Sequence, residues 1–176
     1  MPRAPSFTRQ TAASSAPAAS APADSADGAC VGGKSLSGIS VTTQCVTLFE
    51  QLKSKGAYKF LTFKIDPSGA KVVPDQCGPA NSSFSDFTDA LPESDCRYAV
   101  YDCEYVNADG CQFKKLIFVL WSPDNSQIKA KMMYASTKDF LKGLFPGIAI
   151  EQQATDISEV DAEEMRLKIQ ATLTRK

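Results

Sequence analysis

Few side chains in this 176-residue sequence are of a type and spacing that could carry out catalysis. There is no histidine, which excludes Ser-His-Asp triads, Cys-His nucleophiles and His-ligated zinc. Asp102 and Glu104 alternate along a predicted strand and so share one face, as a pair of acid/base carboxylates would. Residues 32–35 end like a phosphate-binding loop but lack its first glycine and a preceding strand. We therefore expect the two carboxylates to be structural or surface groups, and we expect no enzymatic activity, no cofactor and no metal.

The six cysteines raise the question of metal binding or disulfide chemistry. They are Cys30, Cys45, Cys77, Cys96, Cys103 and Cys111. None are spaced as Cys-x-x-Cys, which argues against a zinc ribbon or a thioredoxin-type pair. A chain of this length does not depend on disulfides for its core, and no secretory signal is evident. We expect reduced, mostly buried thiols, with a disulfide framework as the alternative.

A mixed cationic and apolar pattern offers binding chemistry instead. Residues 127–143 follow helix start signals and carry a long amphipathic pattern. One stripe is expected to face the core: Met133, Thr137, Phe140 and Leu144. The neighbouring stripe and the helix start hold the exposed candidates: Lys129, Lys131, Met132, Ser136 and Asp139. A flexible thioether beside two cations suits a helix that docks on an acidic partner, although such lysines can also simply solvate an exposed face.

The elements that must position this helix follow from the hydrophobic periodicity. Residues 41–52 repeat apolar side chains at helical spacing and Gly56 ends the pattern, which predicts a first helix. Further strands are predicted at 58–65, 71–73, 97–105, 115–121 and 148–150, and further helices at 84–91 and from Asp156 or Ser158 to Leu173. Residues 116–121 are continuously apolar, as in a central strand covered on both faces. The pattern predicts an α/β, α+β-like fold with a central mixed five- to six-stranded sheet sandwiched between helices.

Composition divides the chain into two regions. Residues 1–35 are rich in Ala, Ser and Pro and have almost no large apolar side chains, so we expect a disordered N-terminal extension. Arg3 and Arg9 also give it a faint transit-peptide character. Residues 36–176 are expected to form one globular domain. The net charge of −1 gives no overall attraction to nucleic acid, and no apolar run is long enough for a transmembrane segment.

Several motifs carry a family resemblance. Residues 129–139 read KAKMMYASTKD and resemble the K-x-K-M-x-Y-A-S-x-K-D signature of the ADF/cofilin family. Residues 96–102 (CRYAVYD) and 121–124 (WSPD) match further motifs of the family, and smaller matches begin at Ser37-Gly38-Ile39. Together they cover about residues 37–169 in the family's order. The chain is therefore identified from its sequence as a member of this family.

The resemblance implies one ADF-homology domain that binds actin monomers and filaments and promotes depolymerisation and severing. It implies a cytoplasmic monomer of the actin cytoskeleton. A surface for monomers and filaments is implied at Ser37, Gly38, Ile39, Lys129, Lys131, Met132 and Ser136. A surface for filaments alone is implied at Lys114, Lys115, Arg166 and Lys168. Ser37 matches a regulatory phosphorylation site, and phosphoinositide lipids are implied partners of Lys129, Lys131, Lys138 and Lys142.

The sequence also departs from the family pattern. A long extension precedes Ser37, whereas the family serine normally lies almost at the start of the chain. Phe113 stands where the family usually has Lys or Arg, and Leu167 and Ala171 fall where other members carry charge. We therefore expect weaker filament binding and severing than in typical members. The alternatives are a mainly monomer-sequestering protein with weak severing, and a glia maturation factor-like regulator of actin-related branch complexes.

Overall fold

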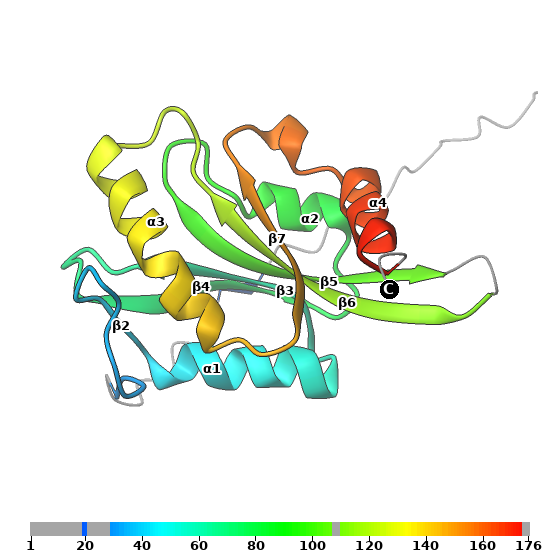
Figure 1. The fold of residues 1–176 in the computed structure, drawn as a ribbon, viewed down its shortest axis with the longest axis horizontal. Helices are drawn as coiled ribbons and strands as arrows, with labels where there is room; N and C mark the ends of the chain where they lie inside the picture. The colour runs from blue at the N-terminus through cyan, green and yellow to red at the C-terminus, as the bar shows by residue number, and fades with distance from the viewer. Residues whose placement is uncertain (1–18, 21–28, 107–109, 174–176) are drawn as a thin grey trace, which may run out of the picture.

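The structure, a computed structural model, describes residues 19–20, 29–106 and 110–173. Its strands are β1 (Ala19–Ser20), β2 (Ser40–Val41), β3 (Tyr58–Ile65), β4 (Lys71–Pro79), β5 (Arg97–Val106), β6 (Gln112–Trp121) and β7 (Ile148–Ala154). Its helices are α1 (Thr43–Glu50), the π-helical turn η1 (Gln51–Lys55), α2 (Phe84–Asp89), α3 (Ile128–Gly143), the 3-10 turn η2 (Ile157–Glu159) and α4 (Ala162–Leu173). Figure 1 shows the strands as one sheet with helices on both sides.

The sheet is mixed, as predicted. Its strand order is β1-β4-β3-β5-β6-β7, and β2 also pairs with β4. The β3–β4 and β5–β6 neighbours are antiparallel hairpins, whereas β6 pairs with β7, and β2 with β4, in parallel. β1 and β2 contribute two residues each, so the five longer strands form the body of the sheet.

Two separate hydrophobic cores lie on the two faces of this sheet. The first joins buried side chains of α1 and α3 to one face, and the second joins α2 and α4 to the other. Strand β6 serves both cores, because Leu116 and Phe118 point into the first while Ile117 and Val119 point into the second. This alternation explains why residues 116–121 are continuously apolar.

Local signals account for most helix ends. Gly56 takes a left-handed conformation (φ 58°) at the end of η1, where the sequence predicts the stop. Ser83 caps α2 and forms a reciprocal capping box with Asp86. The start of the last helix was predicted too early. Asp156 caps the short 3-10 turn η2, and α4 begins only at Ala162. None of the described helices has the length and apolar character needed to cross a membrane.

The segment before the expected domain boundary at residues 35 and 36 makes backbone contacts with the domain. Most of residues 1–35 lie outside the described residues, but residues 29–35 are ordered against the domain. Thr43 N–H donates to Ala29 O (2.9 Å) and Val31 N–H donates to Val41 O (2.8 Å). These contacts use backbone groups, so they do not need the large apolar side chains that the segment lacks. We therefore propose that residues 29–35 belong to the domain, and the extent of disorder before them stays a prediction.

Candidate functional site

The segment before β2, residues 29–39, is held against the long helix α3 by hydrogen bonds between hydroxyl groups. The Ser37 and Thr137 hydroxyls are 2.8 Å apart, and the Ser35 and Ser37 hydroxyls are 2.7 Å apart. Ser35 is buried and also accepts a hydrogen bond from the Ile39 N–H at 3.1 Å. On the other side of Ser35, a Cβ on Gly33 would lie 3.3 Å from the Phe140 ring. The structure therefore brings together the two parts of the first predicted surface, which are about a hundred residues apart in the sequence.

Apolar side chains are exposed on this combined face. Met132 is 68% exposed, and Ile128, one turn earlier on α3, is 78% exposed. Leu36 is fully exposed and lies between the two serines that are hydrogen-bonded near Thr137. Exposed apolar groups of this size on a soluble domain are typical of a protein-binding surface. Ser136 and Asp139 continue the exposed stripe, as the sequence predicts.

Two of these residues, Ile128 and Leu36, were missed by sequence reasoning, and the side chain of one predicted contact residue is buried. The i, i+4 relation of Ile128 to Met132 was a usable signal, but Leu36 carries none without the fold. Ile39 was predicted as a contact, yet its side chain is only 2% exposed and belongs to the first core. The reason is that Ile39 leads directly into β2 beneath α3. Gly38 is exposed and takes a positive φ of 79°, which suits a glycine in the turn between Ser35 and Ile39.

The start of α3 is electropositive. Lys131 lies 3.6 Å from Asp124, which is itself largely exposed, while Lys129 makes no ion pair with any residue that the structure describes. Gln127 occupies the N-cap position without a side-chain hydrogen bond to the helix, and the first turn holds no acidic residue. The helix dipole adds partial positive charge at this end. An anionic group of a partner is therefore attracted to this end of the helix.

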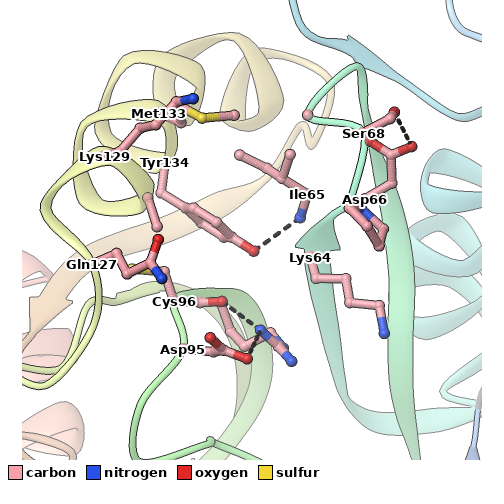
Figure 2. A pocket seen from close by; sticks show the side chains of 14 residues that line it. Lys64, Ile65, Asp66, Ser68, Asp95, Cys96, Gln127, Lys129, Met133 and Tyr134 are labelled. Atoms are coloured by element: carbon pink, nitrogen blue, oxygen red, sulfur yellow. Dashed lines mark hydrogen bonds and ion pairs between the residues drawn. The ribbon is translucent and has the colours of Figure 1, made fainter.

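A hollow of about 690 Å³ lies beside this helix end, between α3 and the β3–β4 turn. Figure 2 shows Lys129 and Met133 on the α3 side, with Asp66 and Ser68 of the turn on the other side. Within it, the Tyr134 hydroxyl accepts a hydrogen bond from the Ile65 N–H at 2.9 Å, which ties α3 to β3. The hollow gives a partner's side chains room to enter beside Lys129.

Two cations that line this hollow, Lys64 and Arg97, belong to a half-buried ionic group. Asp75 lies 2.7 Å from Lys64 and 2.8 Å from the Arg97 Nε, and Arg97 also donates to the Cys96 carbonyl. Burial opposes ionisation of Asp75, but hydrogen bonds from Lys64 and Arg97 outweigh it and hold its pKa below the usual range. These two cations are engaged with the protein itself, so Lys129 is the cation of the hollow that remains available to a partner.

The two remaining lysines of the phosphoinositide prediction lie at the far end of α3. Lys138 and Lys142 both form ion pairs with Glu151 of β7, the latter at 2.5 Å. The hydrogen bonds from Lys138 and Lys142 hold the pKa of Glu151 below its usual range. The structure therefore splits the four predicted lysines into Lys129 and Lys131 at one end of the helix and an internally neutralised pair at the other.

The second predicted surface is assembled from the β5–β6 hairpin and α4, which lie side by side (Figure 1). Lys114 of the hairpin and Arg166 of α4 line one hollow of about 300 Å³. Both are paired with nearby acids: Lys114 of β6 with Glu104 of the neighbouring strand β5 at 2.8 Å, and Arg166 with Glu163 of the same helix at 2.8 Å. The structure thus brings Lys114 and Arg166 together, but neighbouring carboxylates balance much of their positive charge.

The other two residues of this surface differ in their surroundings. Lys168 on α4 donates to the Gln152 side-chain oxygen at 3.2 Å and lies 3.6 Å from Glu164. Lys115 is opposite Cys103 in the hairpin and is half-buried. Lys115 and Lys114 are neighbours on a strand, so they point to opposite faces of the sheet.

Phe113 packs against its neighbours instead of projecting from the hairpin. Its ring stacks on Tyr105, with centroids 5.5 Å apart and an interplanar angle of 19°. It is half-buried against the second core. The residue that replaces the usual cation therefore has a structural role, which is a physical reason for its apolar character.

Asp102 and Glu104 share a face as predicted, but they do not form a catalytic pair. Glu104 is exposed and binds Lys114 and Lys59. Asp102 is 6% exposed, and burial raises the pKa of its carboxyl although Lys59 and Lys114 oppose that shift. Among the described residues, no group of three or more His, Cys, Asp or Glu could hold a metal ion.

Comparison with known proteins gives one consistent result. Residues 38–170 match the family model described as cofilin/tropomyosin-type actin-binding protein. The chain is 45% identical over 127 residues to actin-depolymerizing factor 6 of Oryza sativa subsp. japonica, covering 72% of this chain and 91% of that relative. Identity is also 45% over 127 residues, with the same coverage, for actophorin of Acanthamoeba castellanii. The crystal structure of Streptomyces griseoflavus cofilin superposes with a TM-score of 0.70 at 37% identity, covering 75% of this chain and 97% of that one.

Proposed function

The chain belongs to the ADF/cofilin family of actin-binding proteins, and we propose that it binds actin monomers and filaments and promotes filament depolymerisation. The relatives at 45% identity are named as actin-depolymerizing factor 6 and actophorin, and the match covers nine-tenths of each. The activity requires no reaction chemistry, because it consists of binding and the rearrangement of a polymer. We place it in the cytoplasm, at the actin cytoskeleton, as a monomer.

One observation supports this proposal most strongly: the joined face of α3 and the segment before β2. We define this actin face by Leu36, Ser37, Ile128, Lys129 and Met132. It combines exposed apolar side chains with a cation, Lys129, that forms no ion pair with the described residues. A thioether adapts to the shape of a groove, and a cation at a helix N-terminus attracts an acidic residue of the partner. This combination suits an apolar groove with an acidic rim on actin.

Co-sedimentation with actin filaments tests the proposal. The protein should pellet with filaments and should also increase the actin left in the supernatant. The Lys129→Ala/Lys131→Ala double variant should weaken both effects at least several-fold while its melting temperature stays nearly unchanged, since exposed substitutions cost less than about 0.5 kcal/mol. Lys55→Ala, an exposed lysine on η1, is the matched control and should behave like the wild type. If the double variant keeps full activity, the actin face is assigned wrongly.

A second candidate is a protein that mainly sequesters monomers and severs filaments weakly. It is favoured by the hairpin, where Phe113 packs on Tyr105 and Lys114 is paired with Glu104. A filament surface with balanced charge offers less electrostatic attraction than one with unpaired cations. Counting breaks per filament length by fluorescence microscopy, beside monomer affinity measured separately, distinguishes the two functions.

Regulation at Ser37 is also part of the proposal. A phosphate would add about −1.5 to −2 charges next to Thr137 of α3 and would replace the hydroxyl contact with that residue. Both effects oppose docking of this face on an acidic partner. Phosphoinositide headgroups would compete for Lys129 and Lys131 rather than for the pair held by Glu151.

A further inference from the structure

Cys30 is paired directly with Thr42 in a short antiparallel bridge outside the long strands. The hydrogen bonds lie on either side of the pair, from Val31 N–H to Val41 O and from Thr43 N–H to Ala29 O. Residues in such a non-hydrogen-bonded pair have Cα atoms about 4.5 Å apart and side chains on the same face. The Cys30 thiol therefore lies on the same side of the bridge as the Thr42 side chain.

A second cysteine meets Thr42 from the helix side. Cys45, in the first turn of α1, has its Sγ 3.2 Å from the Thr42 Oγ1. Burial raises the pKa of Cys45 to about 12, and the nearby Cys30 thiol adds to the increase. Cys30 is exposed, whereas Cys45 is fully buried. Thr42 thus stands between an accessible thiol and an inaccessible one.

We propose that Cys30 and Cys45 are a modification site that forms a reversible disulfide by exchange with a small disulfide such as oxidised glutathione. The exposed Cys30 thiolate attacks one glutathione sulfur, so a mixed disulfide forms and one reduced glutathione leaves. The Cys45 thiol then loses its proton and attacks the Cys30 sulfur, which releases the second glutathione. The two cysteines lose two electrons and two protons together, and one oxidised glutathione becomes two reduced ones.

The order of these steps follows from the surroundings of the two thiols. A solvent disulfide cannot reach the buried Cys45, and a thiol with a pKa near 12 is almost wholly protonated at neutral pH. Cys45 therefore reacts only with a sulfur that Cys30 presents at short range. The second step should be slower than the first and should speed up as pH rises.

The disulfide would close a loop over residues 30–45, and this loop contains Leu36 and Ser37. It would fasten the segment before β2 to α1 in addition to its hydrogen bonds with α3. A covalent loop of this length restricts the unfolded chain and is expected to raise the melting temperature by roughly 5 °C or more.

Peptide mapping under non-reducing conditions tests the proposal. The full chain, with Cys111→Ser to remove the exposed thiol of the hairpin, is incubated with oxidised glutathione at about pH 8 and digested, and the linked peptides are identified by mass. The expected result is a Cys30–Cys45 linkage, preceded by a transient glutathione adduct on Cys30 and reversed by a reductant. The adduct should persist in Cys45→Ser, and no linkage should form in Cys30→Ser, which changes only an exposed side chain.

Cys77→Ser is the matched control, because Cys77 is another buried thiol whose pKa burial raises, to about 11. It should leave the Cys30–Cys45 linkage intact. A stable glutathione adduct on Cys30 with no linkage at any pH up to about 9, or a linkage of Cys30 to a different cysteine, would overturn the proposal. The experiment detects disulfide linkages by mass, so its outcome does not depend on whether the protein binds actin.

Discussion

Lys129 is a cation in the first turn of α3, where the helix dipole disfavours positive charge. Replacing it with glutamate should therefore stabilise the fold while it damages the actin face. We expect Lys129→Glu to raise the free energy of unfolding by about 0.3–1 kcal/mol and to weaken actin binding several-fold. Urea unfolding and co-sedimentation measure the two effects. Lys55→Glu controls for the change in net charge, and unchanged actin affinity in Lys129→Glu would contradict the assignment.

Ser37 links two parts of the actin face through its contact with Thr137. Ser37→Ala removes that hydrogen bond but adds no charge, so we expect a small loss of actin affinity. Ser37→Asp adds a negative charge to the face that docks on an acidic partner and should weaken actin binding several-fold more. Ser54→Asp, at an exposed serine on η1, is the control. Equal affinities for Ser37→Ala and Ser37→Asp would show that charge at this position does not regulate binding.

Single residues differ in how well the sequence predicts them. Lys129 and Met132 could be placed on the surface, because helical periodicity alone sets their stripe. The exposure of Leu36 could not be predicted, because it depends on hydrogen bonds from its neighbouring serines to Thr137, a hundred residues later in the sequence. The burial of Ile39, which matches a family contact position, could not be predicted either, because the next residues enter β2 and carry its side chain into the core. Periodicity fixes a helix face, whereas an irregular segment needs its tertiary partner.

At the scale of elements, Glu151 fastens α3 to β7 through Lys138 and Lys142. Because the pKa of Glu151 is lowered in the folded state, its stabilisation is present above the unfolded pKa of about 4.3 and is lost as pH falls through the folded pKa. We expect Glu151→Gln to lower the free energy of unfolding by about 0.5–1 kcal/mol at pH 7, since the pair is partly exposed. Urea unfolding should show that the difference shrinks as the pH falls below about 4.3 and disappears once the pH is below the folded pKa. A difference that persists there would mean that packing, not charge, is lost.

The hairpin depends on Phe113 for its local order. Phe113→Lys breaks the stacking on Tyr105 and should lower the free energy of unfolding by about 1–2 kcal/mol. Phe113→Tyr keeps the aromatic ring and should lower the free energy of unfolding much less. Monomer binding should be unaffected in both variants, because the hairpin is remote from the actin face. Chemical unfolding and monomer titration check these outcomes; a Lys variant as stable as the wild type would show that the stacking contributes nothing.

Most elements could be predicted because their signals are local. The stop at Gly56 and the capping box at Ser83 lie within a few residues of the ends that they define. The late start of α4 could not be predicted, because Asp156 is an equally good cap for η2. The alignment of the hairpin with α4 also needed the fold, since it depends on how the second core packs.

At the scale of the molecule, the segment before β2 marks where the domain begins. Of the contacts between described residues, deleting residues 1–28 removes the two-residue pairing of β1 with β4, so we expect the melting temperature to change by about 2 °C or less. Deleting residues 1–35 also removes the Cys30–Thr42 bridge and the buried Ser35, and should lower it by several degrees. Differential scanning calorimetry of both truncations checks this. Equal melting temperatures would place the boundary after residue 35, as composition alone suggests.

The two hydrophobic cores on opposite faces of one sheet support the two predicted binding surfaces separately: α3 belongs to the first core, and α4 with Phe113 belongs to the second. Changes that do not share a core or a contact combine additively, within about 0.5 kcal/mol. Natural variation could therefore retune one surface without disturbing the other. A lineage could lose filament severing by substitutions around α4 and the hairpin while it keeps monomer binding on α3. Because the sheet separates the two cores, monomer binding and filament severing could evolve independently within one small domain.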